Sequence, residues 1–393
     1  MKKLMVVFSV VIISLVSFII WSINKKEVER IQVHGISTFN PASSENGNHF
    51  LLFYPRDERF SQENTIVKEV DYTGEIIREY EVIDQDFRRM IAHQKPNLMN
   101  QLYISFFGEA TIDNYYFTYD IDEKKFEKVI LDYFDYDVGV DHILHYGNHT
   151  LFQTLVSHKT GDQNLHPETY DFNMSISDYD LKQSFETEYG YAPKWSPLLG
   201  FHNKLIYATA GRINDKDEYE NSGIGLIDLF NQQVEYETFN NDIEFFPLYA
   251  SDKHAYVLSN SGKLYVYDTS FKYKTYEPFK NLPRQDWYYS EENSPLLIDG
   301  RTILTSVYSE DKGSIVGLIE LEPEPVFTPL EKSYLESNYI YKFLYQDIKK
   351  EEIYVLQKNN DETFVLVIDH KTFERKERFP VEYGHMLDFV RPI

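Results

Sequence analysis

After its first 37 residues, the chain is a succession of short runs in which apolar and polar residues alternate. These runs are rich in Val, Ile, Tyr and Phe, and clusters of Asn, Asp, Gly and Pro separate them. Alternation with a period of two predicts half-buried β-strands, and no long stretch shows the 3.6-residue period of a helix. The pattern therefore predicts an all-β fold for residues 38–393.

One five-residue pattern recurs seven times, as an apolar-rich run that ends in an acidic residue. A short turn and another strand follow each acid, and further short strands precede the run, so that each unit holds four strands in about 50 residues, as in a β-propeller. We expect each acid to accept hydrogen bonds from N–H groups of the following turn, which is a structural role. Successive acids are 40 to 58 residues apart, at Asp71, Asp120, Asp178, Asp228, Asp268, Glu320 and Asp369.

The repeats predict a seven-bladed β-propeller of four-stranded antiparallel blades. Two strands are left over, at residues 30–34 and 385–390. One of them is expected to close the ring, and the sequence leaves open which one does so. The predicted blades are 38–84, 98–133, 139–188, 196–240, 245–280, 294–331 and 338–382.

The N-terminal part has a different character. Residues 4–23 are an apolar run without a charged residue, and at 1.5 Å per residue they span the roughly 30 Å of a hydrocarbon core. A cleaved signal peptide is the alternative, but residues 18–22 offer poor small-residue spacing for cleavage. We therefore predict an N-terminal transmembrane helix that is an uncleaved signal anchor in the cell membrane. Residues 1–3 would be cytoplasmic, 24–37 juxtamembrane, and 38–393 an ectodomain outside the cytoplasm.

Charge and composition exclude several classes of function. The chain has 39 Lys+Arg against 63 Asp+Glu, a net charge of −24, whereas a nucleic-acid binder needs a basic face. Anionic lipid headgroups should repel such an ectodomain, so we expect it to stand off the membrane surface rather than lie on it. Because there is no cysteine, disulfides, zinc-thiolate sites, Cys nucleophiles and lipid-modified Cys anchors are excluded. An acidic, anchored, Cys-free ectodomain resembles exported proteins of low-GC Gram-positive bacteria.

The repeated unit also resembles known propeller repeats. An apolar-x-apolar-apolar-Asp run, two or three turn residues and a strand are similar to the YVTN and quinoprotein-like repeats. The stretch 40–50, ahead of LLFYP, resembles the strand opening of TolB-like blades. The resemblance covers about residues 38–391 and implies architecture. It implies no activity, because the sequence lacks Trp-Asp dipeptides, Kelch double glycines, the sialidase box and the repeated Trp motif of quinone-binding dehydrogenases.

We expect a binding site on the face that carries the loops between second and third strands and the links between blades, since long loops on a rigid scaffold often hold function. Long intrablade loops are predicted at 56–63, 158–171 and 211–223. Two interblade links hold the two tryptophans of the ectodomain. Aromatics beside an Arg are typical of partner interfaces and can stack on a sugar ring; the alternative is that both tryptophans pack between blades. The predicted binding residues are Trp287, Tyr288, Tyr289, Arg284, Trp195 and Tyr191.

The candidates for metal binding are weak. Two acidic segments could supply oxygen ligands for Ca²⁺, but neither has the spacing of an EF-hand, and solvated acidic loops are the favoured interpretation. His142 and His145 would point to opposite faces of a strand, which argues against a shared metal. We therefore predict no metal site and no cofactor, with calcium as the weak alternative at Asp135, Asp137, Asp141, Asp215 and Asp217.

Together these features predict a membrane-anchored binding or scaffold module for a protein or glycan of the cell envelope. The alternative is a propeller enzyme of the lactonase, lyase or glycan-cleaving type, with its site at the mouth of the central channel. No catalytic residue is assigned, because the sequence has no G-x-S-x-G elbow, P-loop or G-x-G-x-x-G motif. A third interpretation is a sensory or regulatory subunit of a membrane complex.

Overall fold

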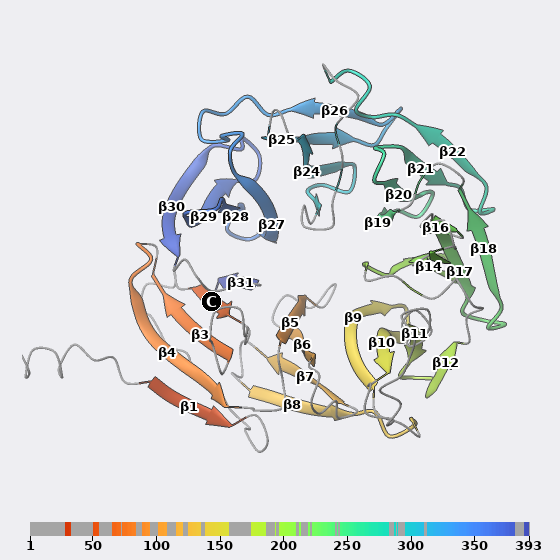
Figure 1. Ribbon diagram of the computed structural model, residues 1–393, viewed down its shortest axis with the longest axis horizontal. Coiled ribbons are helices and arrows are strands. Elements are labelled where there is room, and N and C mark those ends of the chain that lie inside the picture. The colour runs from red at the N-terminus through yellow and green to blue at the C-terminus, as the bar shows by residue number, and fades with distance from the viewer. Residues whose placement is uncertain are drawn as a thin grey trace, which may run out of the picture.

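The structure is a computed structural model in which β-sheets follow one another around a ring (Figure 1). All regular elements of the described part are strands. The structure describes residues 28–32, 50–54, 65–71, 73–83, 89–94, 101–107, 115–120, 125–134, 138–156, 174–185, 193, 196–209, 212–213, 219–220, 222–239, 242, 244–282, 287, 289, 295–309, 313–381 and 389–392.

Blade 1 contains strands from both ends of the chain. Its consecutive strands are β2 (Phe50–Tyr54), β3 (Thr65–Val70) and β4 (Ile76–Ile83). On the inner side β31 (Phe389–Pro392) pairs antiparallel with β2, and on the outer side β1 (Val28–Gln32) pairs parallel with β4. The C-terminal strand is therefore the one that closes the ring, while the N-terminal strand extends blade 1 at its outer edge.

Blades 2 to 4 are four-stranded antiparallel sheets, and blade 4 carries an additional two-stranded hairpin. Blade 2 is formed by β5 (Arg89–Gln94), β6 (Gln101–Phe107), β7 (Tyr115–Asp120) and β8 (Lys125–Ile130), and blade 3 by β9 (Val138–Tyr146), β10 (His149–Val156), β11 (Met174–Asp178) and β12 (Gln183–Phe185). Blade 4 is formed by β13 (Leu199–Phe201), β14 (Lys204–Thr209), β17 (Gly223–Asp228) and β18 (Val234–Thr238), with the hairpin β15 (Arg212–Ile213) and β16 (Tyr219–Glu220).

Blades 5 to 7 repeat the same arrangement. Blade 5 is formed by β19 (Phe245–Ala250), β20 (Ala255–Ser259), β21 (Leu264–Tyr267) and β22 (Tyr273–Tyr276), and blade 6 by β23 (Leu296–Leu297), β24 (Thr302–Ser309), β25 (Gly313–Glu320) and β26 (Val326–Pro329). Blade 7 is formed by β27 (Ile340–Asp347), β28 (Glu352–Lys358), β29 (Thr363–Asp369) and β30 (Arg375–Val381). The all-β fold and the seven blades agree with the sequence prediction.

Two predicted blade boundaries are corrected. Blade 2 begins at Arg89 and not at residue 98, because β5 is its innermost strand and pairs with β6. The sequence of β5, RMIAHQ, has a single β-branched residue and no aromatic one, so its strand signal is weak. Blade 1 takes three strands from the predicted range 38–84, and its innermost strand comes from the C-terminus.

The core lies between neighbouring blades. Side chains of a strand point alternately to its two faces, and in β29 Val365 and Val367 pack with Phe50 of blade 1, while Leu366 packs on the other side with Leu304 of blade 6. Equivalent apolar clusters join blades 2 and 3, 3 and 4, 4 and 5, and 5 and 6. Central strands therefore need apolar residues at nearly every position, and this explains runs such as TFVLVID.

A glycine makes room for a large aromatic ring in blade 4. Gly225 in β17 lies directly opposite Tyr207 in β14, and a Cβ on Gly225 would lie 2.0 Å from Cζ of Tyr207. Tyr207 is fully buried in the core between blades 3 and 4. The glycine thus lets the tyrosine ring lie flat across the neighbouring strand.

Within the described residues, no helix has the length and apolar character needed to cross a membrane. The predicted span at residues 4–23 lies outside them.

Candidate binding face

The two ends of the blades differ in their connections. We define the turn face by the links between first and second and between third and fourth strands. The loop face carries the links between second and third strands and between blades. The described turn-face segments are 71, 73–75, 146–149, 178–183, 201–204, 228–234, 250–255, 267–273, 297–302, 320–326, 347–352 and 369–375. The intrablade connections of the loop face are 55–64, 108–114, 157–173, 210–222, 260–263, 310–312 and 359–362.

On the turn face, five of the seven repeated acids hold the turns that follow them. The Asp369 carboxylate accepts hydrogen bonds from the backbone N–H groups of Lys371 and Thr372, at 3.0 and 2.9 Å. These bonds favour the ionised form and lower the pKa of Asp369 to about 2. The predicted structural role is confirmed at Asp71, Asp178, Asp228, Asp268 and Asp369.

The other two acids do not show this bond among the described residues. The turn after Asp120 lies outside them. Glu320 is exposed, and the next residue, Leu321, donates its N–H to the carbonyl oxygen of Arg301. The turn after Glu320 is thus attached to the neighbouring turn of the same face.

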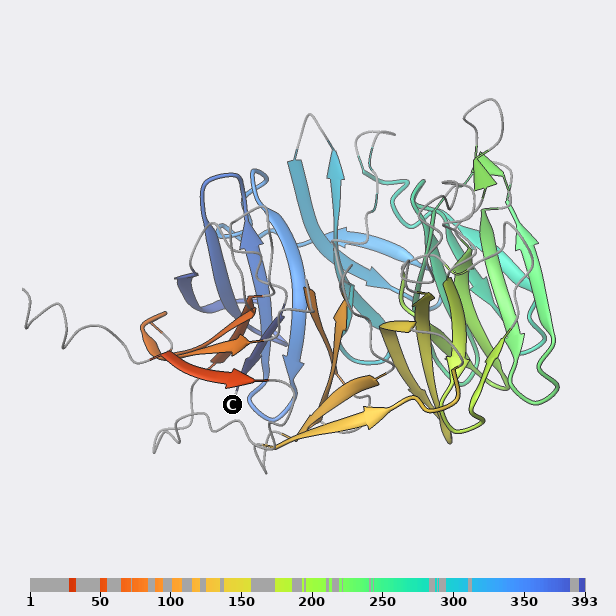
Figure 2. The same cartoon turned by 60° about the horizontal axis from the view of Figure 1, so that its bottom comes forward.

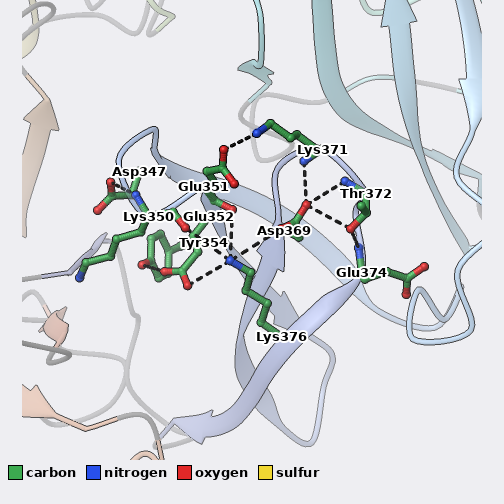
Figure 3. Close-up of polar contacts among 10 residues, drawn as sticks. All are labelled: Asp347, Lys350, Glu351, Glu352, Tyr354, Asp369, Lys371, Thr372, Glu374 and Lys376. Atoms are coloured by element: carbon green, nitrogen blue, oxygen red, sulfur yellow. Dashed lines mark hydrogen bonds and ion pairs between the residues drawn. The ribbon is translucent and has the colours of Figure 1, made fainter. Parts of the chain in front are cut away.

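Further polar contacts cross-link the turn face of blade 7 (Figure 3). The Lys376 ammonium lies 3.4 Å from the carbonyl oxygens of Lys350 and Glu351 and from Oε1 of Glu352. The nearly buried Glu352 also accepts a hydrogen bond from the Tyr354 hydroxyl, at 2.5 Å. The contacts of the Lys376 ammonium with the turn between β27 and β28 attach strand β30 to its neighbours. The polar groups at this end of the blade thus have a structural role.

The loop face carries the larger insertions. Between β14 and β17, strands β15 and β16 form a hairpin with Arg212 opposite Glu220. This lime-green hairpin projects beyond the strands of blade 4 in Figure 2. The candidate calcium residues Asp215 and Asp217 belong to the same insertion and lie outside the described residues. A hairpin that stands clear of the ring is well placed to reach a partner.

Around blade 5 the loop face is compact. The turn at 260–263 closes with a hydrogen bond from Ser259 N–H to the Lys263 carbonyl oxygen, at 2.8 Å. Asp242, in the link from blade 4, accepts hydrogen bonds from the Tyr265 hydroxyl at 2.6 Å and from the Lys263 ammonium at 3.4 Å. Burial opposes ionisation of Asp242, but hydrogen bonds from Ser261, Tyr265 and Lys263 lower its pKa overall. This buried carboxylate locks the link to blade 5.

Two of the predicted binding residues lie in the core beside this turn. Trp287 and Tyr289 are 8% and 2% exposed and belong to the apolar cluster between blades 5 and 6. The Tyr289 ring meets Phe246 edge-on at 4.9 Å, and burial raises the pKa of Tyr289. For Trp287 the structure shows the packing alternative, and Tyr289 packs in the same cluster. The other predicted residues, Arg284, Tyr288, Trp195 and Tyr191, lie outside the described residues.

A polar cluster at the loop face of blade 7 was not anticipated from the sequence. The guanidinium of Arg378 stacks 3.4 Å above the centre of the Phe364 ring and donates to Oε1 of the buried Gln357 at 3.0 Å. It also donates to the Tyr339 hydroxyl, which in turn donates to Glu362. Gln357 is 21 positions and Tyr339 is 39 positions away from Arg378 in the sequence. No short sequence motif therefore connects the three residues.

No group of three or more His, Asp or Glu within the described residues could hold a metal ion. Asp135 and Asp137 lie outside that part, and the side chain of Asp141 is not described. His142 and His145 both lie in β9, three residues apart and hence on opposite faces, as predicted. His145 contacts the ring of Tyr103 at 4.9 Å.

Comparison with known proteins identifies the fold. No family model matches the sequence, and no curated protein matches it. Similar solved structures include TolB from Acinetobacter baumannii, with 11% identity over 88% of this chain and 65% of that chain and a TM-score of 0.43. AztD from Citrobacter koseri shares 10% identity over 87% of this chain and 97% of that chain, with a TM-score of 0.44.

The same ring is found in one structure of a study of two prolyl endopeptidases. It shares 10% identity over 89% of this chain and 51% of that chain, with a TM-score of 0.50. The chain thus spans about half the length of the endopeptidase and about two thirds of TolB. At these identities the likeness concerns fold alone, and the chain is a β-propeller protein of the architecture that its repeats predict.

Proposed function

We propose that the chain is a membrane-anchored, extracytoplasmic binding module whose loop face recognises a protein or glycan of the cell envelope. The apolar run at residues 4–23, flanked by lysines on both sides, supports the anchor. The ring supplies a rigid support on which loops can vary without loss of the fold.

The asymmetry between the two faces carries the proposal. Turn-face segments are short, and aspartates hold five of them in the same way. On the loop face, the intrablade connections differ in length, from three residues at 310–312 to 17 residues at 157–173, and the connection at 210–222 carries β15 and β16. Repetition suits a scaffold, whereas the projecting hairpin of β15 and β16 suits recognition.

Site-specific photo-crosslinking in living cells that make the protein tests this proposal. A photoreactive residue replaces Glu220 in the projecting hairpin of the full-length chain. The matched control replaces Phe230, which lies on the turn face of the same blade and is 93% exposed. We expect a discrete adduct from position 220 and none from position 230, and mass spectrometry would then identify the partner. A glycan partner would instead give adducts that glycosidase treatment removes.

Two results would contradict the proposal. Adducts of equal yield from both positions would mean that the loop face is not the recognition face. The second result would be the absence of an adduct from position 220 together with recovery of the chain in the membrane-free fraction. This result would refute both the membrane anchor and the partner. The enzyme alternative would then be tested with lactone and glycan substrates.

A further inference from the structure

We propose that the turn face lies against the lipid bilayer, with Phe230 and Ile348 in contact with the membrane interface. This inference rests on the proposed function, because it requires the N-terminal anchor. It also adds an orientation, since a ring that rests on its turn face directs its loop face outward.

The first argument is the point at which the chain enters the ring. Strand β1 runs parallel to β4, with Val28 opposite Glu79. Because β4 starts at the turn face, the chain enters β1 from the same side. Residue 23 ends the apolar run five positions before Val28, a distance of at most about 17 Å in a fully extended chain. The outer edge of blade 1 is therefore held close to the bilayer.

The second argument is the distribution of exposed apolar side chains. Phe230 is 93% exposed and Ile348 is 65% exposed, and both lie in turn-face segments. Leu181, Tyr273 and Ile77 lie at the same end of their blades, whereas Ile130 lies at the loop-face end of β8. Five of the six large apolar side chains described as exposed thus share one face. Apolar side chains that water surrounds in the isolated ring gain by entering the interface region of a bilayer.

The third argument is charge. The turn-face segments of blades 4 and 5 contain equal numbers of basic and acidic residues, and those of blade 7 contain four basic and five acidic residues. In contrast, six of the seven intrablade connections of the loop face carry a net negative charge, the exception being 260–263. The negative charge that anionic lipids would repel thus lies mainly on the loop face. Blade 6 is the most acidic part of the turn face, through Glu320, Glu322 and Glu324, and the turn-face segments of blades 1 and 3 also carry a net negative charge. Zwitterionic lipid is therefore the appropriate probe.

The absence of cysteine from the chain permits a test with single labels. Full-length variants Phe230→Cys, Ile348→Cys and Asp361→Cys carry an environment-sensitive fluorophore and are reconstituted into phosphatidylcholine vesicles. Asp361 is exposed on the loop face of blade 7 and is the matched control for Ile348. Lipids with a spin label near the headgroup then quench any fluorophore at the interface. We expect about threefold stronger quenching at positions 230 and 348 than at 361, because interfacial contact places a side chain within the headgroup region.

Blade 4 lies across the ring from β1 (Figure 1), so position 230 distinguishes a ring lying flat from one standing on its edge. Quenching at 348 without quenching at 230 would indicate a ring standing on edge and would overturn the inference. Equal or stronger quenching at 361 would overturn it as well, as would a protein adduct from position 230 in the crosslinking experiment. A chain that does not float with the vesicles would instead refute the anchor, and with it the proposed function.

Discussion

The seam between blades 7 and 1 is where the ring closes, and substitution of Phe50 by alanine tests how that seam is held. Phe50 is in β2, the strand that pairs with the C-terminal β31. Its side chain is 1% exposed. The ring meets Tyr354 edge-on at 5.4 Å and Phe379 at 5.3 Å, both from blade 7. Truncation to alanine removes apolar contacts that join the first blade to the last.

The expected loss follows from these contacts. A buried Phe→Ala substitution lowers the free energy of unfolding by about 3–5 kcal/mol. Aromatic pairs contribute about 0.5–1.5 kcal/mol beyond their buried area, and Phe50 makes two of them. We therefore expect the loss for Phe50→Ala to be about 4 kcal/mol, a large part of the roughly 5–15 kcal/mol that stabilises a typical protein.

Urea unfolding of the full-length chain in detergent micelles, followed by intrinsic fluorescence, measures this loss as a lower transition midpoint at unchanged slope. The same substitution at Phe230 is the matched control, because that ring is 93% exposed. In micelles Phe230→Ala should change the free energy of unfolding by no more than about 0.5 kcal/mol.

A loss below about 1 kcal/mol for Phe50→Ala would refute the reasoning, since truncation of a tightly packed Phe lowers the free energy of unfolding by more than this. It would equally be refuted if Phe230→Ala and Phe50→Ala lowered the midpoint to the same extent. In either case the seam would not be held by the contacts of Phe50.

Three other perturbations have defined outcomes. Gly225→Ala should lower the free energy of unfolding by about 1–3 kcal/mol through overpacking against Tyr207, as measured by thermal unfolding; no loss would mean that the Tyr207 ring can move aside. Removal of residues 389–393 deletes β31 and leaves the edge of β2 unpaired, so size-exclusion chromatography with light scattering should detect self-association; a stable monomer would show that β31 is dispensable. The pKa of Asp369 is lowered from 3.8 to about 2, so the stability that its ionised form contributes is complete above pH 3.8 and is lost as the pH falls toward 2. Asp369→Asn should therefore flatten the dependence of the urea midpoint on pH within this window, and an unchanged slope would contradict the shift.

The fold was predictable where its determinants are local. A turn aspartate such as Asp369 binds N–H groups two and three residues ahead, so the acid and its turn are visible in a short stretch of sequence. Seven such stretches at similar spacing are enough to predict the blades. Ring closure was not predictable in the same way, because β2 and β31 are joined by pairing between opposite ends of the chain. Both terminal strands have adequate strand signals, and tertiary structure decides between them.

The site was harder to predict because burial is not a local property. Trp287 and Tyr289 stand in an interblade link with an Arg nearby, and this composition fits an interface as well as it fits a core. The link crosses the interface between blades 5 and 6, and both rings are buried in the apolar cluster of that interface. The cluster around Arg378 escaped notice for a related reason. Its partners Gln357 and Tyr339 come from other strands, and only the pairing of these strands brings them together.

The two proposals constrain each other through the geometry of the ring. Strand β1 attaches the predicted anchor to the outer edge of blade 1 from the turn-face side, and a rigid ring transmits that orientation to every other blade. If the turn face rests on the bilayer, the hairpin of β15 and β16 points away from the membrane, toward the cell envelope. A partner found at Glu220 therefore has to be reachable from above the ring, whereas a partner embedded in the membrane would have to contact the turn face. Such a membrane partner would exclude the flat orientation, because the bilayer and the partner cannot both cover Phe230.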